Sequence, residues 1–248
     1  MLKRIIKKIL PGKVSEKLWL YRQKWLPPSG LVFFGNLRRL KPIAKHFVRG
    51  LPIDRYYEEM FLHHYREDIR GHVLEIGDDR YTKKFGGKKV ERSDVLHVQE
   101  GNPNATIIAD LTKSEGLTSE IFDCIICSHT LQFIYDVKEA VKTLYRILKP
   151  GGVLLAAGNG ITKISRYDME RWGEYWHFTS LSTRLIFQEL FPPQNVTVKA
   201  YGNVLAAVAF LHGIAAQELR KKVLDYHDPD YEILIAIRAV KPKKEGKE

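Results

Sequence analysis

The residues that could do chemistry begin with a carboxylate and a glycine that end an apolar run, Val73-Leu-Glu-Ile-Gly77. A second carboxylate, Asp94, follows 19 positions after Glu75 and ends another run. This layout is typical of sites where a carboxylate accepts hydrogen bonds from ribose hydroxyls. The positions of two further glycines hold Asp79 and Tyr81, and a carboxylate there would repel a pyrophosphate. The pattern therefore favours a cofactor without phosphates over a nicotinamide dinucleotide.

These residues need a scaffold, and apolar runs alternate with amphipathic segments through most of the chain. Apolar and β-branched residues predict seven strands, at 72–76, 89–94, 106–109, 122–127, 153–157, 196–200 and 231–240. Helical periodicity predicts helices at 53–70, 137–148 and 181–190, the last of them capped by Thr179 or Ser180. The pattern predicts an α/β fold with a Rossmann-like, doubly wound, mostly parallel seven-stranded sheet.

The positive charge of the chain is concentrated at its beginning. Residues 1–50 hold 13 of the 40 Lys and Arg residues but one acid, Glu16, in a chain of net charge +11. Apolar residues recur at helical spacing through Leu2–Leu10 with basic residues between them, which predicts a basic amphipathic helix ending at Pro11. Such a helical arm can anchor at an anionic membrane, pack on the domain or guide a nucleic acid. The first two alternatives are favoured equally, because Trp and Ile are denser here than phosphate contact needs.

We expect three parts: a basic arm at 1–50, a domain at 51–240 and a disordered tail at 241–248. No apolar run reaches the ~18 residues of a transmembrane helix, and lysines interrupt the cluster that a signal peptide would need. The chain is therefore predicted to be cytoplasmic, or peripheral to the inner membrane. Cys124 and Cys127 should point to opposite faces of one strand, as buried structural cysteines of a reducing compartment.

Several segments, in order, resemble class I S-adenosylmethionine-dependent methyltransferases. Val73–Gly77 resembles the first motif of that family, and Asp94 stands where its ribose-binding acid stands. Ile107–Leu111 resembles the segment that contacts adenine. Phe122–Leu131 and Leu148–Leu154 resemble the blocks of the fourth and fifth strands. The resemblance covers about residues 52–240 and implies the fold predicted above.

A narrower resemblance is to type 11-like bacterial methyltransferase domains found beside, or fused to, glycosyltransferases. It is carried by Asp54–Tyr57, Arg171–Thr179 and Gly202–Leu205. Two features depart from the family. The glycine-rich loop is reduced to Gly77, and the Glu-His pair common after the fourth strand in small-molecule relatives is here Gln132-Phe133. The second departure weakens any transfer of the acceptor from those relatives.

The resemblance and the chemistry together assign a set of residues to S-adenosylmethionine. Glu75 and Gly77 would hold its methionine end, and Asp94 would accept hydrogen bonds from its ribose. Asp110 would accept from the adenine amino group, with Leu111 against the ring. The full predicted cofactor set is Glu75, Ile76, Gly77, Asp94, Val95, Asp110, Leu111 and Ser128.

The acceptor side is predicted around the segment 166–178. Aromatic faces stack on sugar rings and Arg can hold an anionic group, which singles out Tyr167, Asp168, Arg171, Trp172, Tyr175 and Trp176. Two histidines are candidates for a general base, His129 after the fourth strand and His177 in the segment, because histidine titrates near neutrality. No metal site is predicted, since Asp225, His227, Asp228 and Asp230 are also typical of a turn.

The sequence therefore predicts a methyltransferase that O-methylates a saccharide or a lipid-linked glycan, held at an anionic membrane surface by residues 1–50. Two alternatives remain. An RNA methyltransferase would use the basic arm as an electrostatic guide and would show steeply salt-dependent affinity for RNA. A non-catalytic binding module would keep the fold without activity, an option that the reduced glycine loop raises.

Overall fold

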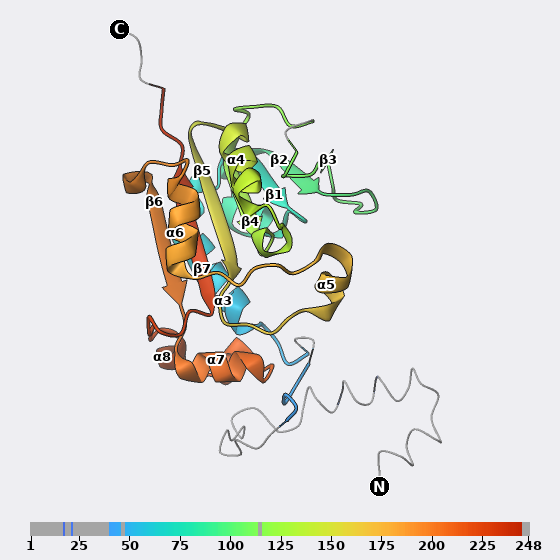
Figure 1. The fold of residues 1–248 in the computed structure, drawn as a ribbon, viewed down its shortest axis with the longest axis vertical. Coiled ribbons are helices and arrows are strands. Elements are labelled where there is room, and N and C mark those ends of the chain that lie inside the picture. The colour runs from blue at the N-terminus through green and yellow to red at the C-terminus, as the bar shows by residue number, and fades with distance from the viewer. Residues whose placement is uncertain (1–16, 18–20, 22–39, 46–47, 114–115, 245–248) are drawn as a thin grey trace.

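The computed structural model describes residues 17, 21, 40–45, 48–113 and 116–244 of the 248. They form one seven-stranded sheet in the order β3-β2-β1-β4-β5-β7-β6 (Figure 1). The strands are β1 Gly71–Ile76, β2 Val90–His97, β3 Ile107–Ile108, β4 Phe122–Ser128, β5 Leu148–Asn159, β6 Val196–Tyr201 and β7 Leu234–Val240. Strands β1 to β5 pair in parallel and β7 is antiparallel to both neighbours. The predicted fold class is confirmed, whereas most of the predicted arm lies outside the described residues.

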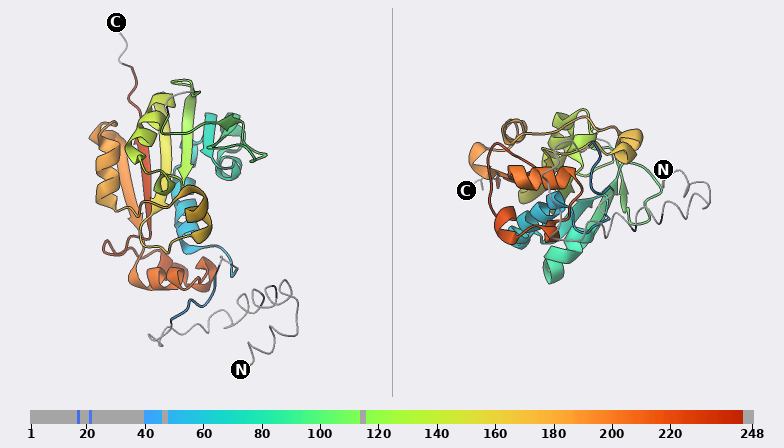
Figure 2. Two further views of the ribbon diagram at one scale, coloured as in Figure 1. Left: turned by 45° about the vertical axis from the view of Figure 1, so that its right-hand side comes forward. Right: turned by 90° about the horizontal axis from the view of Figure 1, so that it is seen from below.

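Helices cover both faces of the sheet (Figure 2). They are α3 Ile53–His64, α4 Val137–Ile147, α5 Arg166–Trp172, α6 Ser180–Gln188, α7 Val204–Leu211 and α8 Lys221–Leu224. One apolar core packs α3 and α7 on one face, and a second packs α4 and α6 on the other. Thr179 caps α6, since its Oγ1 accepts from Ser182 N at 3.1 Å, as predicted. In the part of the chain that is described, no helix has the length and hydropathy to cross a bilayer.

The two cysteines of β4 lie on different faces of the sheet. Cys124 belongs to the core under α3 and α7, and Cys127 to the core under α4 and α6. Both are fully buried and neither forms a disulfide. This confirms the prediction from strand periodicity.

Three segments differ from the sequence prediction. Strand β2 runs to His97, three residues beyond its predicted end, because Val95 and Leu96 continue the pairing with β1. The segment after β1 forms only short helical turns at 82–86 and 87–89. The predicted helix at 53–70 ends as an α-helix at His64.

Candidate active site

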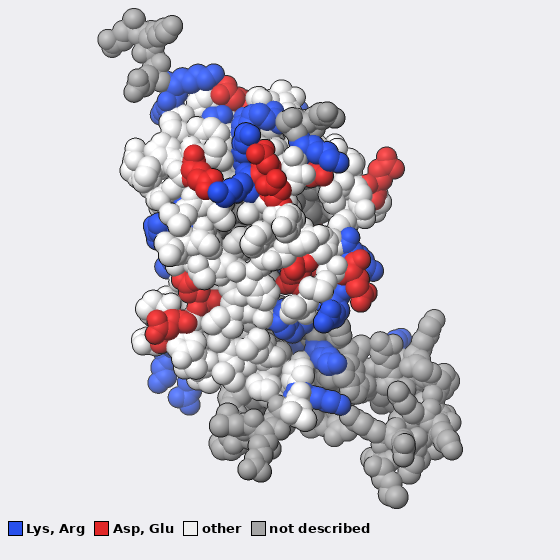
Figure 3. Space-filling model, viewed as in Figure 1, with Lys and Arg blue, Asp and Glu red and all other residues white. Residues whose placement is uncertain are grey.

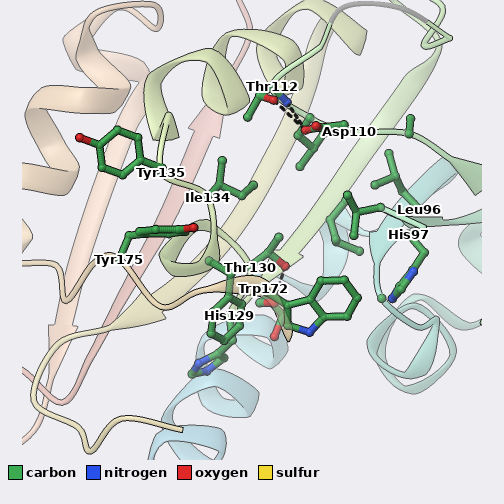
Figure 4. Close-up of a pocket in the computed structure, with 17 residues that line it drawn as sticks. Leu96, His97, Asp110, Thr112, His129, Thr130, Ile134, Tyr135, Trp172 and Tyr175 are labelled. Atoms are coloured by element: carbon green, nitrogen blue, oxygen red, sulfur yellow. Dashed lines mark hydrogen bonds between the residues drawn. The ribbon is translucent and has the colours of Figure 1, made fainter. Parts of the chain in front are cut away.

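A cavity of about 430 Å³ opens at the carboxyl ends of β1, β2 and β4. Ligands of open α/β sheets bind at this edge, and the volume lies within the range of small-molecule sites. One side is made by strand ends and the turns after them: Ile76, Gly77, Leu96, His97, Val98, Ala109, Asp110, Leu111, Thr112, Ser128, His129 and Thr130. The other is largely aromatic: Phe133, Ile134, Tyr135, Trp172 and Tyr175 (Figure 4).

Gly77 ends β1 and exposes its backbone to the cavity. Its φ of 92° lies in the region that favours glycine, and a Cβ added there would meet nothing within 4 Å. Its N–H donates to Leu96 O at 2.9 Å, and its carbonyl accepts from Asn102 Nδ2 at 2.6 Å. The conformation and the open space together leave room for a ligand against the backbone, as predicted for this position.

Glu75 shapes the turn after β1 and does not line the cavity. Its buried carboxylate accepts hydrogen bonds from Tyr81 N at 3.1 Å, from Thr82 N at 2.7 Å and from Thr82 Oγ1 at 2.8 Å. Burial raises the pKa of Glu75 to about 7, against these hydrogen bonds, which favour the ionised form. The structure therefore gives Glu75 a supporting position, because both of its oxygens are already used by the turn.

Asp94 also lies away from the cavity, in the interior of β2. Its carboxylate accepts from His72 Nε2 at 2.6 Å and from Thr106 Oγ1 at 2.8 Å, and it pairs with Arg92 Nε at 3.0 Å. His72 Nδ1 is 3.1 Å from Ile121 O, so both ring nitrogens face acceptor oxygens. The predicted ribose contact by Asp94 is thus not supported by its position, nor is a ligand contact by its buried neighbour, Val95.

His97 occupies the strand end that had been expected at Asp94. Its ring lies edge-on to Trp172, with centroids 5.6 Å apart. Nδ1 lies 2.7 Å from Gln99 O, and because a carbonyl oxygen only accepts, Nδ1 donates to it and Nε2 is left for other contacts. Sequence reasoning missed His97 because the strand was ended too early, although the apolar Val95 and Leu96 pointed to a longer one.

Asp110 and Leu111 follow β3 and both line the cavity. Asp110 Oδ1 accepts from Thr112 N at 2.9 Å and from Thr112 Oγ1 at 2.8 Å. Burial would raise the pKa of Asp110, but these hydrogen bonds and Lys113 lower it below its ordinary value. The carboxylate is therefore ionised, and its oxygens can accept from a ligand amino group.

A buried polar network from α3 supports the end of β4. Glu58 accepts from Ser128 Oγ, from Arg55 Nη1 at 2.7 Å and from Tyr81 Oη at 2.8 Å. Arg55 also donates to Ser128 Oγ at 2.9 Å. Burial would raise the pKa of Glu58, but His129, Arg55 and the hydrogen bonds lower it. The contacts of Arg55 and Glu58 with Ser128 were not predicted, although Asp54–Tyr57 was singled out as a motif.

His129 begins the turn after β4 in a strained backbone conformation. Its φ is 42°, uncommon for a residue other than glycine and often found at functional sites. Its Nε2 lies 3.5 Å from Glu58 Oε2 and 4.0 Å from Asp54 Oδ2 and has no hydrogen-bond partner among the described residues. Burial and the Arg55 guanidinium lower the pKa of His129 despite the two carboxylates. The imidazole is therefore neutral near pH 7, as a general base must be.

The aromatic side is attached to the turn after β4. Tyr175 N donates to Gln132 O at 2.8 Å, and Trp176 Nε1 donates to Ile134 O at 3.0 Å. Trp176 stacks on Tyr135 with centroids 6.2 Å apart. Of the six predicted acceptor residues, Trp172 and Tyr175 line the cavity, and Trp176 supports Tyr135 from outside it.

The remaining predicted acceptor residues, and His177, do not line the cavity. Tyr167 is 65% exposed and carries Arg171 over its ring at 3.5 Å. Asp168 lies in the first turn of α5, where its N–H donates to the capping Ser165 Oγ. The exposed His177 lies 3.5 Å from Glu174 Oε1 and does not line the cavity. The sequence showed an aromatic segment but not which side of α5 would face the ligand.

The acidic stretch before β7 forms the predicted turn. Asp228 Oδ1 accepts from Asp230 N at 3.1 Å. Asp225 pairs with Lys221 at 2.6 Å, and His227 packs edge-on against Tyr201. These side chains therefore contact other residues of the fold.

The sheet order, with β7 antiparallel and a cavity at the strand ends, defines the class I methyltransferase fold. It is shared with a SAM dependent methyltransferase from Archaeoglobus fulgidus (TM-score 0.51, 13% identity, 78% of this chain and 96% of that one). It is also shared with phosphoethanolamine N-methyltransferase 2 of Haemonchus contortus, solved with S-adenosyl-L-methionine (TM-score 0.52, 14% identity, 92% and 57%). At these identities the likeness is one of fold.

Residues 59–156 match the family model of the methyltransferase domain. Over 88 residues the chain is 34% identical to ubiquinone/menaquinone biosynthesis C-methyltransferase UbiE of Haemophilus ducreyi. The aligned stretch makes up 36% of this chain and 28% of that protein. The match thus spans less than a third of that relative. The chain carries an S-adenosylmethionine-dependent methyltransferase domain.

Proposed function

We propose that this chain transfers the methyl group of S-adenosylmethionine to a hydroxyl of a saccharide or lipid-linked glycan. The cofactor supplies a methyl group already activated by its sulfonium. The protein must then align the acceptor within about 3–3.5 Å and exclude water. The observation that carries the proposal is the cavity itself, which joins ionised and backbone groups at strand ends to aromatic faces on the opposite side.

The residues that line the cavity fit this cofactor. Asp110 would accept from the adenine amino group beside the apolar Leu111. His97 Nε2 would accept from a ribose hydroxyl in place of the expected carboxylate. The open backbone at Gly77 would face the methionine end, where Arg55, through its contact with Ser128, supplies a positive charge for the carboxylate.

His129 is the base that we assign. The residue contributes to the cavity lining, and its buried Nε2 lies 3.5 Å from Glu58 Oε2, whose negative charge would stabilise an imidazolium formed when a hydroxyl proton is taken. The geometry favours His129 over His177, because the latter is exposed and outside the cavity.

Aromatic side chains support a saccharide acceptor. Tyr135 and Tyr175 are 74% and 50% exposed and lie edge-on to one another, with ring centroids 5.5 Å apart. Exposed aromatic rings at a cavity offer stacking surface for a sugar. They would also stack on a quinone-type ring, and the relative from Haemophilus ducreyi makes C-methylation of such a ring the second candidate.

The test separates cofactor binding from acceptor choice. The full-length protein is first titrated calorimetrically with S-adenosylmethionine; no binding at millimolar cofactor would leave only a non-catalytic module. Protein and methyl-labelled cofactor are then incubated with lipid-linked glycan precursors, demethylated quinone precursors and total RNA. We expect label in the glycan fraction. Label confined to quinones or to RNA would contradict the saccharide proposal while keeping the methyltransferase.

A further inference from the structure

Helix α7 is apolar on every side. Its sequence, Val204-Leu-Ala-Ala-Val-Ala-Phe-Leu211, contains no polar residue. A helix on the surface of a globular domain normally carries polar residues on its outer side, and one that is apolar all round is normally buried or in contact with lipid. In α7 half of the residues are exposed.

The exposed residues of α7 form one stripe. At about 100° per residue, they fall on one face within about 120° and the buried ones fall opposite. The stripe consists of Val204 (50% exposed), Leu205 (40%), Val208 (36%) and Leu211 (40%). Ala206, Ala207, Ala209 and Phe210 pack into the core beneath. Contiguous exposed apolar surface of this kind marks an interaction site.

The stripe is held rigidly at both ends of the helix. Asn203 caps α7 through Ala206 N and donates from Nδ2 to Val223 O at 2.7 Å and to Tyr226 O at 2.8 Å. At the other end, Ala44 N donates to His212 O at 2.9 Å. The stripe is thus a fixed surface of the folded domain.

The charged residues around this surface indicate which class of partner it fits. Residues 1–39 contain ten Lys and Arg and the single acid Glu16. They precede the described segment 40–45, in which Ala44 N donates to His212 O at the end of α7. Helix α8 packs beside α7; Arg220 precedes it and Lys221 and Lys222 begin it, all three exposed, and Lys221 pairs with Asp225 at 2.6 Å. In Figure 3 the surface over α7 is white, with Lys and Arg surface to both sides of it and an Asp or Glu patch next to the basic one on the α8 side. Apolar surface bordered by cations is complementary to an anionic lipid bilayer.

We propose that the α7 stripe, Val204, Leu205, Val208 and Leu211, is the surface by which the folded domain contacts an anionic membrane. Tyr226, 63% exposed beside the first turn of α7, would lie at headgroup depth. Strands β4 and β5 point to the end of the molecule where α7 lies (Figure 1), and residues that follow β4 line the cavity, so the cavity and the stripe lie toward the same end of the molecule. This inference does not depend on which acceptor is methylated.

The test measures sedimentation of the full-length protein with phosphatidylcholine vesicles, with and without phosphatidylglycerol. The variant Val204→Gln/Val208→Gln changes the stripe, and Leu181→Gln/Leu185→Gln is its matched control on α6, where the same spacing leaves those residues 63% and 56% exposed. We expect wild type and control to bind the anionic vesicles alike and the α7 variant at least tenfold more weakly. Melting temperature and cofactor titration establish that each variant is folded, and Leu211→Ser is a second variant should the pair unfold.

Four outcomes would overturn the proposal. They are wild type that ignores anionic vesicles, equal binding to neutral ones, an α7 variant that binds like wild type, and a control that loses as much. A further contrary result is a stripe variant that changes only the oligomeric state in gel filtration, since the stripe would then join copies of the chain.

Discussion

The strand-end side of the cavity and its aromatic side differ in what fixes their residues. Gly77, Asp110 and Ser128 lie where parallel strands end, so the register of the sheet brings them together. Trp172 and Tyr175 reach the cavity through α5 and through hydrogen bonds to the turn after β4. Backbone geometry thus sets one side and side-chain packing the other. Changes on the first side should therefore reduce function more than changes on the second.

The largest expected effect separates the two candidate bases. His129→Gln should lower kcat by at least about 100-fold, because it removes a general base at the cavity, while His177→Gln should leave kcat nearly unchanged. Since the pKa of His129 is lowered, the wild-type kcat/KM should decline on the acidic side with a midpoint at a pH below 6.5, the ordinary histidine pKa. Equal losses in both variants, or an unchanged acidic limb in His129→Gln, would contradict the assignment.

The next largest effect is expected for Gly77→Val. A side chain at φ 92° is strained by about 1–2 kcal/mol and intrudes on the cavity, so calorimetry should show cofactor affinity lower by more than tenfold. Gly87→Val is the matched control. Its φ of 58° is also positive, an added Cβ there meets nothing within 4 Å, and it lies outside the cavity. Comparable loss of affinity in the control would mean that Gly77 acts only through stability.

Two aspartates sharpen the comparison within the strand-end side. Asp110→Ala should weaken cofactor binding about tenfold, or about 1.4 kcal/mol, with little change in stability. Asp94→Asn should leave binding unchanged and lower the free energy of unfolding by about 2 kcal/mol, since it breaks charged hydrogen bonds to His72 and Arg92. Weaker cofactor binding with an unchanged free energy of unfolding in Asp94→Asn would instead support Asp94 as a cofactor ligand.

The effect of Asp94→Asn on the free energy of unfolding should depend on pH. Burial opposes ionisation, but hydrogen bonds from His72, Thr106 and Arg92 lower the pKa of Asp94. Its stabilising contribution is therefore present above the ordinary value of 3.8 and is lost as pH falls through the lowered pKa. Denaturant unfolding of wild type and Asp94→Asn should converge at acidic pH and diverge near neutrality; a constant difference would refute this account.

The smallest effect is expected on the aromatic side. Tyr175→Ala should raise the KM for the acceptor several-fold, because a stacking contact contributes about 1 kcal/mol, and leave cofactor affinity unchanged. Tyr167→Ala, on the outer side of α5, should change neither. A loss of cofactor affinity in Tyr175→Ala would place the cofactor against the aromatic side.

The same contrast explains what the sequence could predict. The number of strands and their positions along the chain followed from apolar runs, and the places of Gly77, Asp110, Leu111 and Ser128 at the cavity followed from strand ends. Asp94 lies in the interior of β2 because the strand runs three residues beyond its predicted end, and in a parallel sheet that shift moves a side chain away from the ligand edge. The oxygens of Glu75 are used by the N–H groups of Tyr81 and Thr82 and by the Thr82 hydroxyl. Their assignment to the cofactor stays a prediction. Arg55, Glu58 and Tyr135 depend on contacts between distant segments, which spacing alone does not encode.

The cysteines of β4 have a consequence for how opening of this fold can be measured. Cys124 is covered by the α3 and α7 layer and Cys127 by the α4 and α6 layer. Burial raises the pKa of the Cys127 thiol to about 12, so it reacts only when its layer opens. The rates of thiol labelling in Cys124→Ala and Cys127→Ala would therefore report separately on the two layers, and a lipid surface that steadies α7 would slow the labelling of Cys124 alone.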